Sequence, residues 1–193
     1  MGKYQSTKLF DGYSACFRQW KAEGTHCRFL HGYAVSFRVC FEGDLDERNW
    51  VWDFGGMKRT KTNINGRSPK AFFEYLLDHT TIVAEDDPYL ENFKQMDQDG
   101  IIQLRILPAV GCERFAEYLY QVINEFLQLE TQGRVRATKV EVYEHERPHS
   151  KPAFTSFTSS LKRFNESSSP ECTTTSSRSK RILEPRLIMP SST

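Results

Sequence analysis

The chain reads VSFRVCFE at residues 35–42, and this stretch decides the fold class. Its large apolar side chains alternate with polar or small ones, which is the period of a β-strand with one buried face. A turn-rich stretch at residues 43–46 and a short apolar run, Trp50–Phe54, come next. We therefore expect a second strand there, paired in an antiparallel hairpin, with Lys8–Arg18 as a further partner strand.

Two amphipathic helices and a last strand follow this hairpin in the sequence. Ser68 and Pro69 form a helix start, an N-cap with proline in the first turn, and apolar residues at helical spacing continue to about Asp78. A longer apolar stripe predicts a helix from Gly111 or Cys112 to Leu129, before a strand at Val135–Glu144. The order predicts an α+β domain with two helices on one face of an antiparallel sheet.

The composition changes near Ser150. From Ser150 to Thr193 the chain has 18 Ser or Thr, 7 Lys or Arg and 3 Asp or Glu. Such a segment has too few apolar side chains to offset its ordering entropy, so we expect a basic, largely disordered tail. We place the domain boundary between residues 154 and 155, with a folded domain at 1–154 and the tail at 155–193.

Charge and cysteine content exclude several classes of protein. The net charge of +1 gives no electrostatic argument for nucleic acid binding by the folded domain. No apolar run approaches the ~20 residues of a membrane span, and no secretory signal opens the chain, so a cytoplasmic protein is expected. The five cysteines are an odd, scattered set, which argues against a disulfide framework.

Five short motifs point to one family of enzymes. The first is Cys27–Tyr33, which reads CRFLHGY. The others are Trp52–Phe54 followed by Met57-Lys58, Leu77-Asp78-His79, Gly111-Cys112-Glu113 and Val142-Tyr143-Glu144. In order and spacing the set resembles the 6-pyruvoyltetrahydropterin synthase and 6-carboxytetrahydropterin synthase family, whose signature is Cys-x-x-Leu-His-Gly-His. The resemblance covers about residues 8–154.

The resemblance implies a tunnelling fold (T-fold), in which subunits form an oligomeric barrel, usually a hexamer, with active sites between subunits. It implies that Cys27 is the proton-transferring thiolate and that Asp78 with His79 forms a relay. Glu144 would anchor a pterin through its two acceptor oxygens, with Glu113 as a second substrate-binding candidate. A cysteine becomes a useful base only where its pKa falls toward neutrality.

The metal site departs from the family pattern. The family holds zinc with three histidines, and here only His31 remains, because Phe17 and Tyr33 stand at the other two positions. Cys16 and His26 could join His31 in a substitute set, but Cys16 should point away from the face that Phe17 occupies. Zinc is thus the cofactor that the resemblance implies, with an incomplete set of ligands. The two aromatic rings would instead offer a surface on which a flat heterocycle could stack.

Each of these residues also has an ordinary structural explanation. Cys27 could be an inert core residue, and Asp78–His79 could end a helix with a favourable charge. Glu144 shares a strand face with core valines, yet it could pair with Lys139. Glu113 could simply favour a helix N-terminus.

Two classes of function therefore stay open. The first is a 6-carboxytetrahydropterin synthase-like lyase, which would act on 7,8-dihydroneopterin triphosphate on the route to 7-deazaguanine and queuosine. The second is a catalytically altered T-fold protein that binds a pterin or purine as a regulator or assembly component. Apart from these two, a metal-independent reaction on such a ring is possible, with Cys27 and His79 as its catalytic residues.

Overall fold

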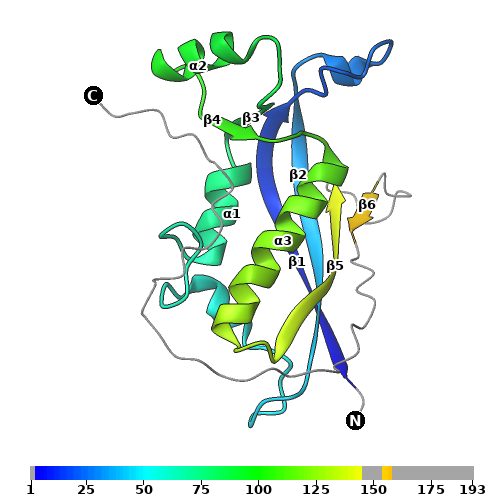
Figure 1. The fold of residues 1–193 in the computed structure, drawn as a ribbon, viewed down its shortest axis with the longest axis vertical. Helices are drawn as coiled ribbons and strands as arrows, with labels where there is room; N and C mark the ends of the chain where they lie inside the picture. Colours follow the sequence, from blue (N-terminus) through cyan, green and yellow to red (C-terminus); the bar gives the residue numbers. More distant parts are fainter. Residues whose placement is uncertain (1–2, 145–153, 158–193) are drawn as a thin grey trace, which may run out of the picture.

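A computed structural model describes residues 3–144 and 154–157 of the 193-residue chain. The strands are β1 (Tyr4–Phe17), β2 (His31–Gly43), β3 (Thr80–Ala84), β4 (Leu104–Leu107), β5 (Val135–Tyr143) and β6 (Phe154–Phe157). The helices are α1 (Pro69–Leu77), α2 (Leu90–Gln98) and α3 (Cys112–Glu130), with short 3-10 turns η1 (His26–Arg28) and η2 (Phe54–Lys58). In the described residues the strands form one sheet in the order β4-β3-β1-β2-β5-β6 (Figure 1).

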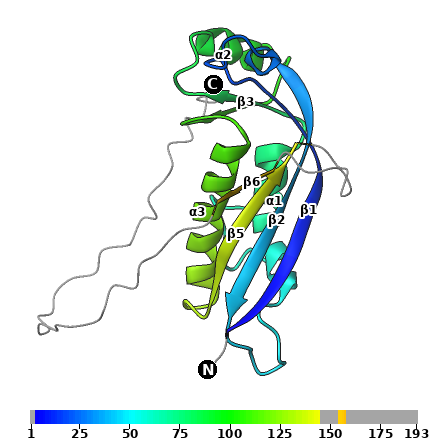
Figure 2. The ribbon, with the colours of Figure 1, turned by 90° about the vertical axis from the view of Figure 1, so that its right-hand side faces the viewer.

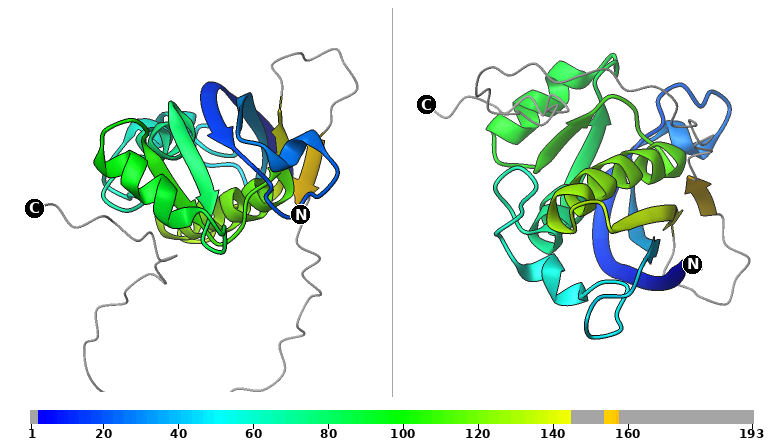
Figure 3. Two further views of the ribbon diagram at one scale, coloured as in Figure 1. Left: turned by 90° about the horizontal axis from the view of Figure 1, so that it is seen from above. Right: turned by 60° about the horizontal axis from the view of Figure 1, so that its bottom comes forward.

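The core lies between the sheet and two of the helices. From α1, Phe73 packs edge-on against Phe10 and Phe37, at ring-centroid distances of 5.3 and 5.0 Å. From α3, Phe115 meets Phe17 at 5.0 Å. Because β1 and β2 present these phenylalanines on one face, α1 and α3 cover that same face, and α3 runs along the sheet (Figures 2 and 3). The prediction of two helices on one face is confirmed.

The sheet is mixed, so the prediction of an antiparallel sheet was wrong in part. β1, β2, β5 and β6 pair antiparallel, whereas β3 pairs parallel with both β1 and β4. All five residues of β3 are buried. A strand covered on both faces shows no alternation of apolar and polar residues, which is why the pattern of the sequence did not reveal it.

Residues 80–107, which hold β3, α2 and β4, sit at the same end of the molecule as the β1–β2 loop (Figure 1).

Trp50–Phe54 was wrongly predicted as a strand. The Asp46 carboxylate accepts the backbone N–H of Trp50 at 3.0 Å, and Asp53 accepts that of Gly55 at 2.8 Å. These local hydrogen bonds compete with strand pairing and turn the backbone into η2. The strand that pairs with β2 on this side is β1, as predicted, with Phe17 opposite His31.

The prediction of a Ser/Thr-rich tail falls almost wholly outside the described residues. β6 pairs with β5 and spans the residue at which the domain was predicted to end. No helix among the described residues is long and apolar enough to cross a membrane.

Candidate functional site

Three aromatic rings meet where β1 ends and β2 begins. Phe17 lies opposite His31 in the strand register, and Tyr33 is two residues further along β2 on the same face. The rings of Phe17 and Tyr33 stack with centroids 3.9 Å apart and an interplanar angle of 10°, while His31 lies 4.4 Å from Tyr33. Phe17 and Tyr33 are buried and His31 is exposed. The structure thus brings together the three positions that the sequence analysis compared with metal ligands.

The surroundings of Tyr33 disfavour the ionised form of its hydroxyl. Burial, followed by the charge of Glu144 and by the thiols of Cys27, Cys112 and Cys16, raises the pKa of Tyr33 to about 12. Tyr33 is therefore a neutral phenol at physiological pH. Cys27 from the β1–β2 loop and Glu144 from the end of β5 thus both influence the ionisation of Tyr33.

Cys112 holds Glu144 in place. The Cys112 thiol, at the first residue of α3, lies 3.6 Å from Oε1 of Glu144 and is buried. Burial, and then the negative charge of Glu144, raises the pKa of Cys112 well above its usual range, so its S–H stays protonated and can donate. The competing partner Lys139 ion-pairs with Glu141 at 2.7 Å. Cys112 was predicted as a helix start and as the middle residue of the Gly111-Cys112-Glu113 motif, but its contact with Glu144 was not predicted.

The loop that carries Cys27 is closed by a backbone hydrogen bond. The N–H of Gln19 donates to the carbonyl of Cys27 at 2.8 Å, and Cys27 sits half-buried in η1. The Nδ1 of His31 lies 2.8 Å from the carbonyl of Phe29, which can only accept, so Nδ1 carries a proton and Nε2 does not when the ring is neutral. Cys27 is thus a free, half-buried cysteine in a loop outside the core.

Asp78 and His79 form a pair at the end of α1, beside β1. The Nδ1 of His79 lies 3.0 Å from Oδ1 of Asp78, which also accepts the backbone N–H of Ser14 on β1 at 3.1 Å. Burial alone would raise the pKa of Asp78, but the hydrogen bonds from Ser14 and His79 outweigh it and lower that pKa. His79 follows the end of α1 at a φ of 54° and is exposed. Among the described residues, no hydrogen bond or ion pair joins this pair to Cys27.

Comparison with known proteins identifies the family. The family model of 6-pyruvoyl tetrahydropterin synthase matches residues 7–151. The chain belongs to this family. No match was found among curated proteins.

Solved structures with this fold include an uncharacterized protein from Wolinella succinogenes. It has a TM-score of 0.64 and 20% identity, over 82% of this chain and 99% of that one. The 6-pyruvoyl tetrahydropterin synthase of Caenorhabditis elegans has a TM-score of 0.51 and 16% identity, over 83% and 98% of the two chains. That of Plasmodium vivax has a TM-score of 0.50 and 15% identity, over 80% and 99%. At these identities the likeness shows the fold alone.

The residues at the three metal-ligand positions do not fit the zinc site that the resemblance implies. A phenyl ring has no donor atom, and the raised pKa of Tyr33 disfavours the phenolate that would bind a cation. His31 is then the one imidazole at these positions. Among residues 3–144, no group of three His, Cys, Asp or Glu side chains is placed to hold a metal ion.

Glu113 lies at the opening of α3, close to the site but exposed. Beside it is the carboxamide of Gln19, which packs on Gly111. A Cβ added at Gly111 would lie only 2.3 Å from Nε2 of Gln19 and 3.5 Å from Oε2 of Glu113. Nothing in the sequence pattern pointed to Gln19, because the contact joins residues that are far apart in the chain.

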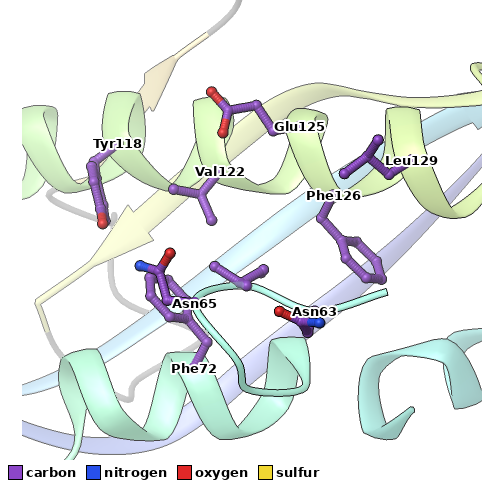
Figure 4. A pocket seen from close by; sticks show the side chains of 9 residues that line it. Asn63, Asn65, Phe72, Tyr118, Val122, Glu125, Phe126 and Leu129 are labelled. Atoms are coloured by element: carbon purple, nitrogen blue, oxygen red, sulfur yellow. The ribbon is translucent and has the colours of Figure 1, made fainter. Parts of the chain in front are cut away.

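A separate pocket lies between α3 and the turn at residues 63–65 (Figure 4). Tyr118 points from α3 toward α1 there, and its buried hydroxyl has no hydrogen-bond partner in the described part of the chain. Burial, and to a smaller extent the charge of Glu125, raises the pKa of Tyr118 to about 12. None of the predicted site residues lines this pocket.

Proposed function

We propose that this member of the 6-pyruvoyl tetrahydropterin synthase family binds a pterin ring at Glu144 and acts on it as a lyase. The observation that carries the proposal is the contact of the buried Cys112 thiol with Oε1 of Glu144 at 3.6 Å. Cys27 and Glu144 both influence the pKa of Tyr33 as well. An ionised carboxylate can accept two parallel hydrogen bonds from the adjacent N–H donors of a pterin edge. Because Cys112 donates to Oε1, Glu144 is held in one orientation before the ring arrives.

In this proposal the substrate is 7,8-dihydroneopterin triphosphate and the reaction is that of a 6-carboxytetrahydropterin synthase, in 7-deazaguanine and queuosine biosynthesis. Cys27 transfers a proton at the side chain of the pterin. Asp78 and His79 handle the second proton as a carboxylate–imidazole pair, with Nδ1 of His79 3.0 Å from Oδ1 of Asp78. No step uses a metal ion, because the residues at the ligand positions do not supply a zinc site.

The proposal also requires a second copy of the chain. Within one chain, the Asp78–His79 pair is bonded to Ser14 and not to Cys27. The resemblance implies active sites between the subunits of a barrel, usually a hexamer. In such an assembly a neighbouring subunit would bring its own Asp78–His79 pair to Cys27. A monomeric protein with full activity would refute this part.

One observation favours a second candidate function, ring binding without turnover. Phe17 and Tyr33 are buried and stack on each other, so aromatic packing fills two positions at which metal-assisted cleavage would need ligands. A chain of this kind would act as a regulator or assembly component. The two functions share the pocket and differ only in product formation.

Incubation with 7,8-dihydroneopterin triphosphate separates the candidates. Products are resolved by chromatography, and bound metal is measured on the same preparation. The lyase gives a new pterin product that disappears in Cys27→Ala, whereas Glu144→Ala abolishes ring binding. Glu113→Ala is the matched carboxylate control and should have a smaller effect. Binding without product supports the second candidate, and absence of binding refutes both.

A further inference from the structure

We infer that Gln19 is a positioning residue, which clasps the loop carrying Cys27 onto the start of α3 and so fixes the thiol relative to Glu144. This inference rests on the proposed function. Gln19 belongs to none of the motifs that define the family resemblance. Its role follows from three separate contacts.

The first contact joins Gln19 to Cys27 itself. The backbone N–H of Gln19 donates to the carbonyl of Cys27 at 2.8 Å and closes the loop between β1 and β2. The position of Cys27 therefore depends directly on the position of Gln19. A shift of the Gln19 backbone would carry the thiol with it.

The second contact joins Gln19 to Gly111, at the start of α3. Its carboxamide packs on Gly111, so closely that a Cβ there would come within 2.3 Å of Nε2. Gly111 has a φ of 133°, a conformation that L residues with a Cβ rarely adopt, and it immediately precedes Cys112. Cys112 in turn holds Glu144. Gln19 thus links the loop of Cys27, through its backbone, to Gly111, through its side chain, and Gly111 is next to the residue that contacts Glu144.

The third set of contacts fixes the residues on either side of Gln19. Arg18 forms a bidentate ion pair with Asp87, at 2.8 and 3.1 Å, and the indole N–H of Trp20 donates to Asp86 at 3.0 Å. Both acids lie in the turn after β3, and the Asp87 side chain is only 1% exposed. With its neighbours held on both sides, Gln19 has little freedom to move away from Gly111.

The test compares Gln19→Ala with Gln19→Met in the full chain. Alanine removes the contact with Gly111, whereas methionine has a similar length and can fill the same space without hydrogen bonding. For a positioning residue, Gln19→Ala should lower kcat about tenfold or more, because small misplacements of a reacting group are costly, and leave KM within about twofold. Gln19→Met should restore most of kcat.

A second measurement does not depend on turnover. The rate of alkylation of Cys27 by iodoacetamide, followed by mass spectrometry of its peptide, should change several-fold in Gln19→Ala and return toward the wild-type rate in Gln19→Met. If the wild-type protein neither binds nor converts a pterin, the proposed function fails, while these rates still decide whether the clasp exists.

The chain offers a matched control at the other end of α3. Gln128 packs on Gly133, a glycine with a φ of 79°, and Nε2 of Gln128 would lie 3.2 Å from an added Cβ. Gln128→Ala removes the same kind of contact far along the helix and should leave kcat and the alkylation rate of Cys27 unchanged. Three results would each overturn the inference: an unchanged Gln19→Ala, a Gln19→Met as impaired as Gln19→Ala, or an equal effect of Gln128→Ala.

Discussion

Replacing Phe17 and Tyr33 together by histidine should create a zinc site. Both positions lie on the same face as His31, with Phe17 directly opposite it and Tyr33 two residues along β2. His31 already has its Nδ1 hydrogen-bonded to the Phe29 carbonyl, which leaves Nε2 to coordinate. The three imidazoles would then supply the protein ligands of a tetrahedral site with one open position.

The loss of stability expected in the absence of metal follows from the contacts that the two aromatic rings make. Without metal, Phe17→His/Tyr33→His loses the 3.9 Å stack and the 5.0 Å edge contact with Phe115. Each is worth about 1 kcal/mol, and an unpaired polar group buried in their place costs about 1–3 kcal/mol more. The apo variant should therefore be about 3–5 kcal/mol less stable than the wild type. Zinc at about 1,000 times Kd restores about 4 kcal/mol, or roughly 8–16 °C in Tm.

Thermal unfolding with and without zinc chloride, and metal analysis after dialysis, measure these effects. The expected stoichiometry is about one zinc ion per chain. The control adds His31→Ala to the double variant, which removes one ligand and should abolish the zinc-dependent rise in Tm. A folded double variant that neither retains zinc nor gains stability from it would refute the placement of these three positions around one point.

Three further outcomes follow from individual contacts. Asp87→Ala leaves Arg18 without its buried partner and should lower the free energy of unfolding by about 3–5 kcal/mol. Asp44→Ala, at an exposed pair, should have a much smaller effect, and equal losses in urea unfolding would contradict the structure. Ser68→Ala removes the oxygen that caps α1 and should lower the free energy of unfolding by about 1 kcal/mol. Circular dichroism melts measure this loss, and an unchanged Tm would contradict the capping role. The buried thiol of Cys112, whose pKa is raised, should resist iodoacetamide until the chain is unfolded in urea, and rapid labelling of the native protein would count against that burial.

Much of the fold could be predicted because three strands and two helices carry clear periodicities. β2 has one buried face, and α1 begins at a serine cap followed by proline, so both gave strong local signals. β3 is buried on both faces, and α2 has a single fully buried residue, Phe93, so neither shows the pattern of a half-buried element. The segment that adds parallel strands to the otherwise antiparallel sheet was therefore not predicted.

The candidate site, like the fold, could be predicted only in part from the sequence. The motifs indicated Cys27 and Glu144, and both influence the pKa of Tyr33. Their joint dependence on Cys112 and Gln19 could not be predicted, because it arises from contacts between segments far apart in the chain. The roles of Asp78 and His79 stay predictions, since they depend on a neighbouring subunit.

The stack of Phe17 on Tyr33 also makes a metal site hard to reach by single substitutions. A single histidine at either position would break the stack, yet it would give only two imidazoles and too few ligands to hold zinc firmly. Each one-step variant would therefore be less stable than the present chain and would gain little metal affinity in return. Both substitutions are therefore needed before metal binding could offset the stability lost with the stack.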